Sequence, residues 1–376
     1  MNFGFNAEQK SLGDTVAERL GDFPALLAPD PADAHDPQVW DALAELGLFA
    51  LLVPEEDGGV GLSLVDVALA VEALGAGLAP PIVASTLIAT DILVTFGTAA
   101  KKSHWLPVIA TGEARIAIAV LESGQGYDPG AVKATFKGGR LNGAKILTPG
   151  GQDAHAFLVL ARGDHGPVLV IVDRETPGLS VRPHSDLDAS SGLCELVLNQ
   201  VAVDDGALAG LGLAGAAVDR LVDVAATVYA GLEIGIAARM LETAVEYAKT
   251  REQFGQAIGA FQAIKHRCAD MAVAVEAGRS AAYYAFWAVS EDAPDRGRAS
   301  SMAKAYCGEV TRDACNETIQ IHGGMGFTWE LGLHRFLRRA KVMEHAFGNH
   351  VWHYERVALL TLCAGREGEV PQRGAA

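Results

Sequence analysis

The stretch that decides the fold is YAKTREQFGQAIGAFQAIKHRCADM, residues 247–271. Its pattern predicts the end of one long helix, a tight connection and the start of a second helix. Arg251 complements the carbonyl end of the first helix, and Gly255 and Gly259 suit the connecting loop. Phe254 would anchor that loop. Taken one residue at a time, these features indicate a helical hairpin and no particular chemistry.

The segments around this stretch are also helical. From about residue 214, apolar residues three and four apart form one stripe: Val218, Leu221, Ala225, Val228, Leu232 and Gly235. Further helical runs follow at about 263–290, 297–320 and 332–363. Four long helices with short connections predict an antiparallel four-helix bundle over residues 213–365, followed by a tail at 366–376.

The preceding segment, residues 114–212, has a different pattern. Its short runs, such as RIAIAVLE, AHAFLVLAR and PVLVIVD, are rich in β-branched residues and separated by turn residues. Asn142-Gly143 is a strong signal for a hairpin turn. We therefore expect a β-domain here.

Residues 1–113 again show helical periodicity. Asn6 with Gln9 three positions later has the pattern of a capping box, and Ser63 with Asp66 would cap a later helix. The predicted fold is mainly α with a β middle domain: an N-terminal helical domain, a small β-barrel or sandwich, and a C-terminal four-helix bundle.

Composition excludes several classes of function. The 376 residues are 50% hydrophobic and 20% charged, as in a globular protein, and the net charge of −16 argues against nucleic acid as a partner. The five cysteines form no CxxC motif, which indicates reduced thiols in an intracellular, cytoplasmic protein. There is no secretory signal pattern, and the apolar runs look too short to span a membrane.

Three strings together resemble one family. Residues 247–271 resemble the RxQFGxxIxxFQ segment and following ADM of the acyl-CoA dehydrogenases. WDALAELGLFALLVPEEDGGVGLS (40–63) looks like that family's N-terminal signature, and IQIHGGMGFTWE (319–330) looks like its C-terminal element. The GGxG in the last string does not follow a strand, so it is no Rossmann fingerprint.

The resemblance implies a tetrameric flavoprotein that oxidises an acyl-CoA thioester to the trans-2-enoyl-CoA. In the family, a carboxylate removes the α-proton while the β-hydrogen leaves as hydride to FAD, and an electron-transfer flavoprotein is the usual electron acceptor. The matching motif positions imply FAD contacts that reach across a dimer interface into the neighbouring subunit's site. These positions are Arg251, Phe254, Gln262, Gln320, Gly323 and Gly324.

The sequence departs from the family where the subunit's own flavin ring would lie. Leu121 stands in place of a flavin-bonding Thr, although the adjacent Glu122 is retained. Leu147 replaces an aromatic residue, and Pro149, which has no backbone N–H, replaces a hydroxyl residue near flavin N5. Gly150 replaces an Asn. Together these changes indicate loss of a site.

The catalytic base is also missing from its expected position. Ungapped alignment puts Phe347 at the catalytic Glu, and a phenyl ring accepts no proton. Some members carry the base on the first bundle helix, where this chain has Ala225. Asp223 and Glu233 would serve only if that helix shifts its register, and Glu344 only after a shift of three residues. His345, like Glu344, precedes Phe347 and would serve only as a displaced base about one turn away. The histidines near the C-terminus have no metal-ligand spacing, so we expect polar interface groups and no metal site.

Three hypotheses follow. In the first, the chain is the non-catalytic subunit of a heteromeric acyl-CoA dehydrogenase, completing the FAD site of a paralogous partner. It would then keep the motifs that serve a neighbour while losing those of its own site. In the second, it is an active homo-oligomer with a relocated base. In the third, it is a flavin-free binding or scaffold protein on the same fold.

Overall fold

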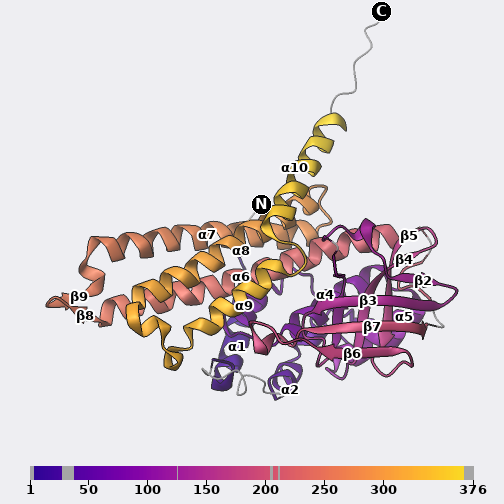
Figure 1. Cartoon of the computed structure of the whole chain (residues 1–376), viewed down its shortest axis with the longest axis horizontal. Coiled ribbons are helices and arrows are strands. Elements are labelled where there is room, and N and C mark those ends of the chain that lie inside the picture. The colour runs from indigo at the N-terminus through magenta and orange to yellow at the C-terminus, as the bar shows by residue number, and fades with distance from the viewer. Residues whose placement is uncertain (1–3, 28–37, 125, 204–205, 211, 368–376) are drawn as a thin grey trace, which may run out of the picture.

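The computed structural model describes residues 4–27, 38–124, 126–203, 206–210 and 212–367. The predicted order of a helical, a β and a helical part is confirmed (Figure 1). The N-terminal part contains five α-helices: α1 (Ala7–Gly21), α2 (Gln38–Glu45), α3 (Ala68–Ala76), α4 (Pro81–Phe96) and α5 (Ala99–Ala110).

Of the two predicted helix caps, one is confirmed and one is wrong. Asn6 and Gln9 form the capping box of α1, since each side chain accepts a hydrogen bond from the other's backbone N–H. Asp66 does not cap α3, which begins only at Ala68 without a side-chain cap. The Asp66 carboxylate instead accepts from the backbone N–H and hydroxyl of Ser63, closing a turn upstream of the helix.

The middle part is a curled seven-stranded sheet. Its strands are β1 (Ile116–Ala119), β2 (Thr135–Lys137), β3 (Arg140–Thr148), β4 (Ala156–Gly163), β5 (Gly166–Asp173), β6 (Leu179–Pro183) and β7 (Cys194–Ala202). The strand order is β1-β4-β2-β3-β7-β6, and β5 pairs with β4. β1 and β4 run parallel, while β3 pairs antiparallel with β2 and β7.

The predicted Asn142-Gly143 hairpin is wrong. Both residues lie inside β3, and the hairpin turn falls at Gly138 and Gly139, with φ of +53° and +69°. Two consecutive residues with positive φ are what a two-residue hairpin turn requires, and glycine supplies them at no steric cost. Asn142-Gly143 instead marks an irregularity in the β3–β7 pairing, where Asn142 Oδ1 accepts from the backbone N–H of Gln200.

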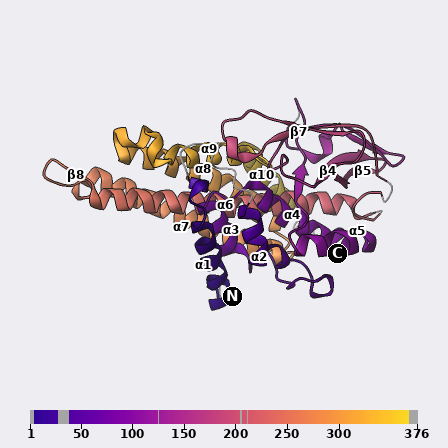
Figure 2. The ribbon, with the colours of Figure 1, turned by 90° about the horizontal axis from the view of Figure 1, so that it is seen from below.

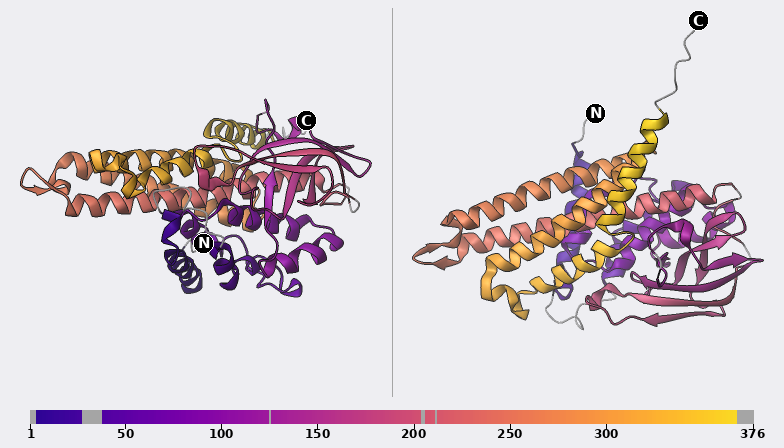
Figure 3. Two further views of the ribbon diagram at one scale, coloured as in Figure 1. Left: turned by 60° about the horizontal axis from the view of Figure 1, so that its bottom comes forward. Right: turned by 45° about the horizontal axis from the view of Figure 1, so that its top comes forward.

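The C-terminal bundle consists of α6 (Ala214–Thr250), α7 (Gln262–Ser290), α8 (Arg296–His322), α9 (Leu333–His345) and α10 (His350–Glu367). A short hairpin of β8 (Glu252–Gln253) and β9 (Gln256–Ala257) joins α6 to α7. The bundle extends away from the sheet, and α1 to α3 lie on one side of it (Figures 1 and 2). Two further views show α10 rising out of the bundle (Figure 3).

The single helix expected over residues 332–363 is in fact two helices. α9 ends at His345 and α10 begins at His350. Between them, Phe347 and Gly348 have φ of +56° and +118°, which no α-helix accommodates. The first two residues of the tail expected over 366–376 belong to α10, which continues to Glu367; residues 368–376 lie outside the described part of the chain.

Helix α6 forms the centre of the molecule. All six residues of its predicted apolar stripe are buried. By length and composition α6 could cross a membrane, so the expectation that every apolar run is too short is wrong, but 89% of its most apolar window is buried inside the protein. Gly75 of α3 and Gly235 of α6 permit the close crossing of these helices, because a Cβ at either position would collide with the other backbone.

Four of the five cysteines lie where their side chains are described. Cys194, Cys268, Cys307 and Cys315 are all free thiols, and three of them are buried. Burial raises the pKa of each of these thiols. The side chain of Cys363 lies outside the described part of the chain.

Candidate functional site

The first group of predicted FAD contacts lies at the far end of the bundle, where the β8–β9 hairpin joins α6 to α7 (Figure 1). Arg251 follows the end of α6 with an extended backbone. Phe254 has φ of +54° at the hairpin turn and is 94% exposed. Gln262 begins α7, and its Oε1 lies 2.9 Å from Nε2 of His266. All three predicted residues are exposed.

The second group, Gln320, Gly323 and Gly324, lies at the end of α8 and is also exposed. Gly323 has φ of +59° and ψ of −135°, a region that glycine alone enters readily. The rings of Tyr247 and His322 stack with centroids 4.0 Å apart. Because Tyr247 belongs to the last turns of α6 and His322 ends α8, this contact holds the two groups at the same end of the bundle.

We call this end of the bundle, residues 251–262 and 320–331, the bundle tip. Its surface is strongly apolar, with exposed side chains at Phe254, Met325, Phe327, Trp329 and Leu331. Contiguous exposed apolar residues of this size mark binding surfaces in soluble proteins. Arg251 adds a cationic guanidinium, and open space surrounds Gly323 and Gly324. A phosphate and an adenine ring of a flavin dinucleotide fit such a surface.

A cavity of about 470 Å³ lies at the other end of α9, between the sheet and the bundle. Strands β1 and β3, the loop before β7, and α9 form its walls. The residues on these walls are Ile118, Val120, Leu121, Tyr127, Leu147, Pro149, Asp186, Leu187, Leu193, Lys341, Val342, His345, Ala346 and Phe347. Of the five positions at which the sequence departs from the family's flavin and base residues, four, namely 121, 147, 149 and 347, therefore line one cavity, and Gly150 does not.

Phe347 occupies the break between α9 and α10. Its backbone is left-handed, and its ring packs edge-on against Tyr229 of α6, with centroids 5.0 Å apart. At the position of the expected Glu, the cavity wall is therefore formed by an aromatic ring that packs on α6. Nothing at this position can take up a proton.

Glu122, the residue retained beside Leu121, has a structural role. It accepts hydrogen bonds from Nζ of Lys145 at 2.6 Å and from the backbone N–H groups of Lys133 and Ala134. Burial opposes ionisation of Glu122, but the hydrogen bond from Lys145 and the backbone donors leave its pKa lowered. This buried ion pair ties the loop that carries Leu121 to strand β3.

The cavity does not fit a flavin ring. The polar edge of an isoalloxazine carries several hydrogen-bond acceptors and needs donors from the wall. Among the described residues that line the cavity there is no Ser or Thr, and Pro149 has no backbone N–H; the side-chain donors present are Tyr127, Lys341 and His345. Of the lining cations, Lys341 is bound to Glu344, with Nζ to Oε2 at 3.1 Å. The chemistry of these walls therefore differs from that of the bundle tip, which fits the dinucleotide end of FAD.

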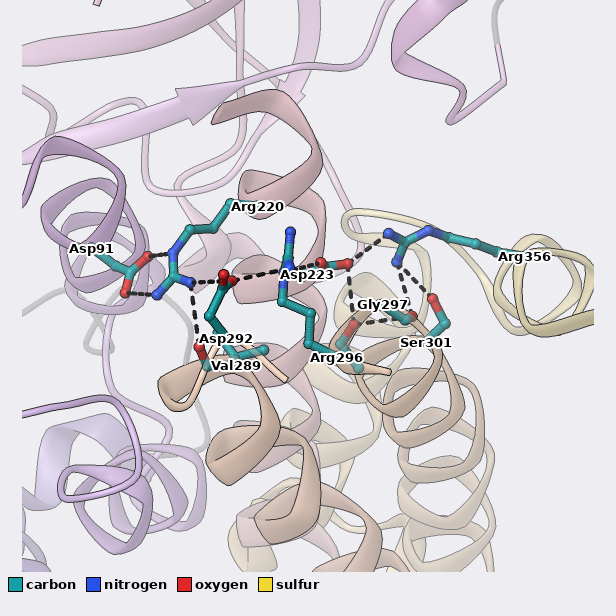
Figure 4. Close-up of polar contacts among 10 residues, drawn as sticks. Asp91, Arg220, Asp223, Val289, Asp292, Arg296, Gly297, Ser301 and Arg356 are labelled. Carbon is teal, nitrogen blue, oxygen red and sulfur yellow. Dashed lines mark hydrogen bonds and ion pairs between the residues drawn. The ribbon is translucent and has the colours of Figure 1, made fainter. Parts of the chain in front are cut away.

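Asp223, one of the three carboxylate candidates for a relocated base, is held in a network of ion pairs with arginine side chains (Figure 4). Its Oδ1 accepts from Arg356 of α10 at 2.6 Å, and its Oδ2 lies 3.2 Å from Nε of Arg296. Arg220 continues the network, pairing with Asp91 of α4 at 2.7 Å. Asp223 therefore anchors α8 and α10, and it does not line the cavity.

Glu233 and Glu344, the other two candidates, are also committed to ion pairs. Glu233 is fully buried between α6 and α8, with Oε1 2.8 Å from Nζ of Lys304. Burial raises the pKa of Glu233 to about 7 against the effect of that lysine. Glu344 binds Arg312 and Lys341, which hold its pKa below the usual value although burial acts to raise it. Neither carboxylate lines the cavity.

Asp186 is the carboxylate that sequence reasoning missed. It is the one acidic residue on the cavity wall, in the loop between β6 and β7. Its Oδ1 accepts from the backbone N–H of Asp188 at 2.6 Å, and its Oδ2 accepts from the hydroxyl of Ser191 at 2.8 Å. Burial raises the pKa of Asp186. The sequence did not predict this position, because Asp186 is far from Phe347 in the chain and the pattern around it indicates only a turn.

The histidines have individual roles. His322 and His353 are buried within this subunit, so the prediction of polar interface groups is wrong for these two. Burial lowers the pKa of His353 to about 2. In the described part of the chain, no group of three or more His, Cys, Asp or Glu side chains could hold a metal ion.

Comparison with known proteins matches all three parts of the chain to one family. The profile for "Acyl-CoA dehydrogenase, N-terminal domain" matches residues 6–113, that for the middle domain matches 117–201, and that for the C-terminal domain matches 207–359. A relative in Bacillus subtilis, the probable acyl-CoA dehydrogenase YngJ, is 33% identical over 92% of this chain and 95% of its own length.

Solved structures agree with this match. Butyryl-CoA dehydrogenase from Megasphaera elsdenii superposes with a TM-score of 0.89 at 26% identity, covering 96% of this chain and 100% of its own. A chain of the ChsE4-ChsE5 complex from Mycobacterium tuberculosis superposes with a TM-score of 0.85 at 27% identity, covering 99% and 100%.

Proposed function

Because the chain belongs to the acyl-CoA dehydrogenase family, we propose that it acts as a subunit without the catalytic Glu that completes the FAD site of a paralogous partner subunit. The reaction of the complex would be the α,β-dehydrogenation of an acyl-CoA thioester. FAD, held between the two subunits, would supply the hydride acceptor. An electron-transfer flavoprotein is the electron acceptor we expect.

The single observation that carries the proposal is the contrast between the two ends of the bundle. At the bundle tip, every predicted FAD contact is exposed and free of the protein core. In the cavity, Phe347 stands at the position of the base, and the walls do not fit a flavin ring. A subunit that serves a neighbour requires a tip that fits FAD, and it does not need a flavin site in the cavity at the other end of α9.

The residues of the bundle tip would divide the work of binding. Arg251 would pair with a phosphate of the pyrophosphate, since a guanidinium offers paired donors to phosphate oxygens. Phe254 would stack against an aromatic ring. Gly323 and Gly324 would let the backbone approach the dinucleotide closely, and Gln262 and Gln320 would bond its polar edges.

An unlike partner is the form of assembly we propose. A chain of the ChsE4-ChsE5 complex, a complex of two differently named proteins, has the same fold as this chain. Two copies of this chain would place each tip beside a second cavity without a base. A partner that keeps the Glu would supply the missing half of the site.

The two other hypotheses have less support. A relocated base at Asp223, Glu233 or Glu344 would have to leave an ion pair and reach a cavity that none of the three lines. A flavin-free binding or scaffold protein would use the exposed apolar residues of the tip, but it leaves Arg251, Gln262 and Gln320, which match the family's FAD contacts, without a role.

The test is to co-express the chain with a paralogue that carries the Glu and to measure FAD in the purified complex. Arg251→Ala should remove most of the flavin, while Arg239→Ala, an exposed arginine on α6 outside the tip, should leave it in place. Flavin that stays bound in the Arg251→Ala complex, or chains that never associate, would rule out the proposal.

A further inference from the structure

The cavity beside Phe347 is large enough to be a binding site in its own right. Its volume of about 470 Å³ falls within the range of small-molecule sites. Leucines from separate elements dominate its walls: Leu121 after β1, Leu147 on β3, and Leu187 and Leu193 before β7. Such walls favour an apolar ligand, because each square ångström of apolar surface removed from water adds to binding.

The backbone around the cavity is held in place without a ligand. The buried Lys145–Glu122 pair secures the loop of Leu121. On the opposite side, Asp188 forms a buried ion pair with Arg339 of α9, which also donates to the backbone carbonyl of Ser190 at 3.2 Å. Two buried ion pairs therefore brace the two walls, so the cavity is pre-formed and a ligand need not order it.

The acidic group on the wall, Asp186, remains able to accept a hydrogen bond from a ligand. Each carboxylate oxygen of Asp186 accepts one hydrogen bond from its own loop, at 2.6 Å and 2.8 Å. A carboxylate has about four lone-pair sites, so acceptor capacity is left on each oxygen. A neutral hydroxyl would satisfy it, whereas an anionic group placed there would be repelled by both Asp186 and the neighbouring Asp188.

We propose that this cavity binds a neutral apolar small molecule whose hydroxyl group donates a hydrogen bond to the Asp186 carboxylate. In the proposed complex with a paralogous partner, the redox reaction would not take place in this cavity. The cavity would then be a separate ligand site on this subunit. The inference rests on the part of the proposed function in which the cavity holds no flavin ring.

The test uses two probes with the same ring system, 2-naphthol and 2-methoxynaphthalene; the second has a methyl group in place of the hydroxyl hydrogen and therefore cannot donate a hydrogen bond. Binding to the chain purified alone is measured by calorimetry. The naphthol should bind about tenfold more tightly, since a hydrogen bond to a charged group contributes that much or more. Asp186→Ala should abolish the difference, and Leu121→Trp, which fills the cavity, should weaken both probes.

Controls separate binding from folding. Asp14→Ala, at an exposed site on α1, should leave both affinities unchanged. If Asp186→Ala unfolds the loop, Asp186→Asn keeps an acceptor for the Asp188 N–H while removing the charge, and should reduce the preference for naphthol.

Three outcomes would overturn the inference, and they differ in whether they also refute the proposed function. Equal affinity for both probes, or binding unaffected by Leu121→Trp, refutes the ligand site and leaves the proposed function standing. Displacement of 2-naphthol by riboflavin shows that the cavity is a flavin site, and refutes both.

Discussion

Replacing Lys304 by Met should destabilise the bundle strongly, because it strands a buried carboxylate. Lys304 Nζ lies 2.8 Å from Oε1 of Glu233 and donates to the backbone carbonyl of Met343 at 3.0 Å. Both charged side chains are at most 1% exposed. Met has similar length and apolar character, so the variant removes the charge while keeping the volume.

The expected loss follows from the burial of the pair. Breaking a buried ion pair from one side costs about 3–5 kcal/mol, because the remaining charge has neither water nor a partner. For a cooperative unit of the bundle's size, this lowers Tm by roughly 6–20 °C. The double variant Glu233→Met with Lys304→Met should recover most of that loss, since no charge is left behind.

The destabilisation by Lys304→Met should depend on pH, because Glu233 is ionisable. The pKa of Glu233 is raised from 4.5 to about 7, so the protonated form is favoured in the folded protein. The stability from this proton is present below about pH 4.5 and is lost as the pH rises through about 7. Without Lys304 the pKa of Glu233 rises further. The loss of stability in Lys304→Met should therefore be small near pH 5, where Glu233 is protonated, and large near pH 8.

The assay is thermal unfolding followed by circular dichroism at both pH values. Lys265→Met, an exposed lysine on α7, is the matched control and should change Tm little. An equal loss for Lys304→Met at both pH values would contradict the reasoning, as would a double variant no more stable than the single one.

Three other predictions concern stability and can be checked by the same melting experiment. Phe347→Ala removes the contact with Tyr229 and should cost about 1–3 kcal/mol, whereas Phe254→Ala, 94% exposed, should not lower Tm. Gly323→Ala, at φ +59°, should lower stability by about 1 kcal/mol, and Gly324→Ala, in open space without positive φ, by less. Burial acts to raise the pKa of Asp188, but Arg339 leaves it lowered in the folded protein. The stability that follows from this shift is present above the pKa that Asp188 has in the unfolded chain, and it is lost as the pH falls through the folded-state pKa. Asp188→Asn should therefore lower Tm at pH 7 and change it little near pH 2.

Much of the fold could be predicted from the sequence because periodicity reports burial. The apolar stripe of α6 and the capping box at Asn6 follow directly from local patterns. The turn was harder to predict. Asn142-Gly143 has the stronger hairpin signal, yet the pairing of β2 with β3, in which Lys137 lies opposite Arg140, places the turn at Gly138-Gly139. Pairing partners decided that register, and a single strand's sequence does not contain them.

The site was predictable only in part, for a physical reason. The motifs predicted Arg251 and Gly323 as FAD contacts, and both lie at the bundle tip; their role stays a prediction. The alignment predicted Phe347 at the position of the Glu, and Phe347 lines the cavity. The break beside Phe347 is a tertiary effect, stabilised by its packing on Tyr229, so the helical pattern over residues 332–363 did not signal it. Asp186 reaches the cavity through a loop whose course depends on the buried Asp188–Arg339 pair, 151 residues apart in sequence.

The most direct test of the account is the flavin content of the chain alone and in complex with a paralogue that carries the catalytic Glu. The account predicts a colourless chain when purified alone and a yellow complex with about one FAD for each pair of unlike chains. A chain that is yellow by itself, and whose colour bleaches when an acyl-CoA is added, would contradict it.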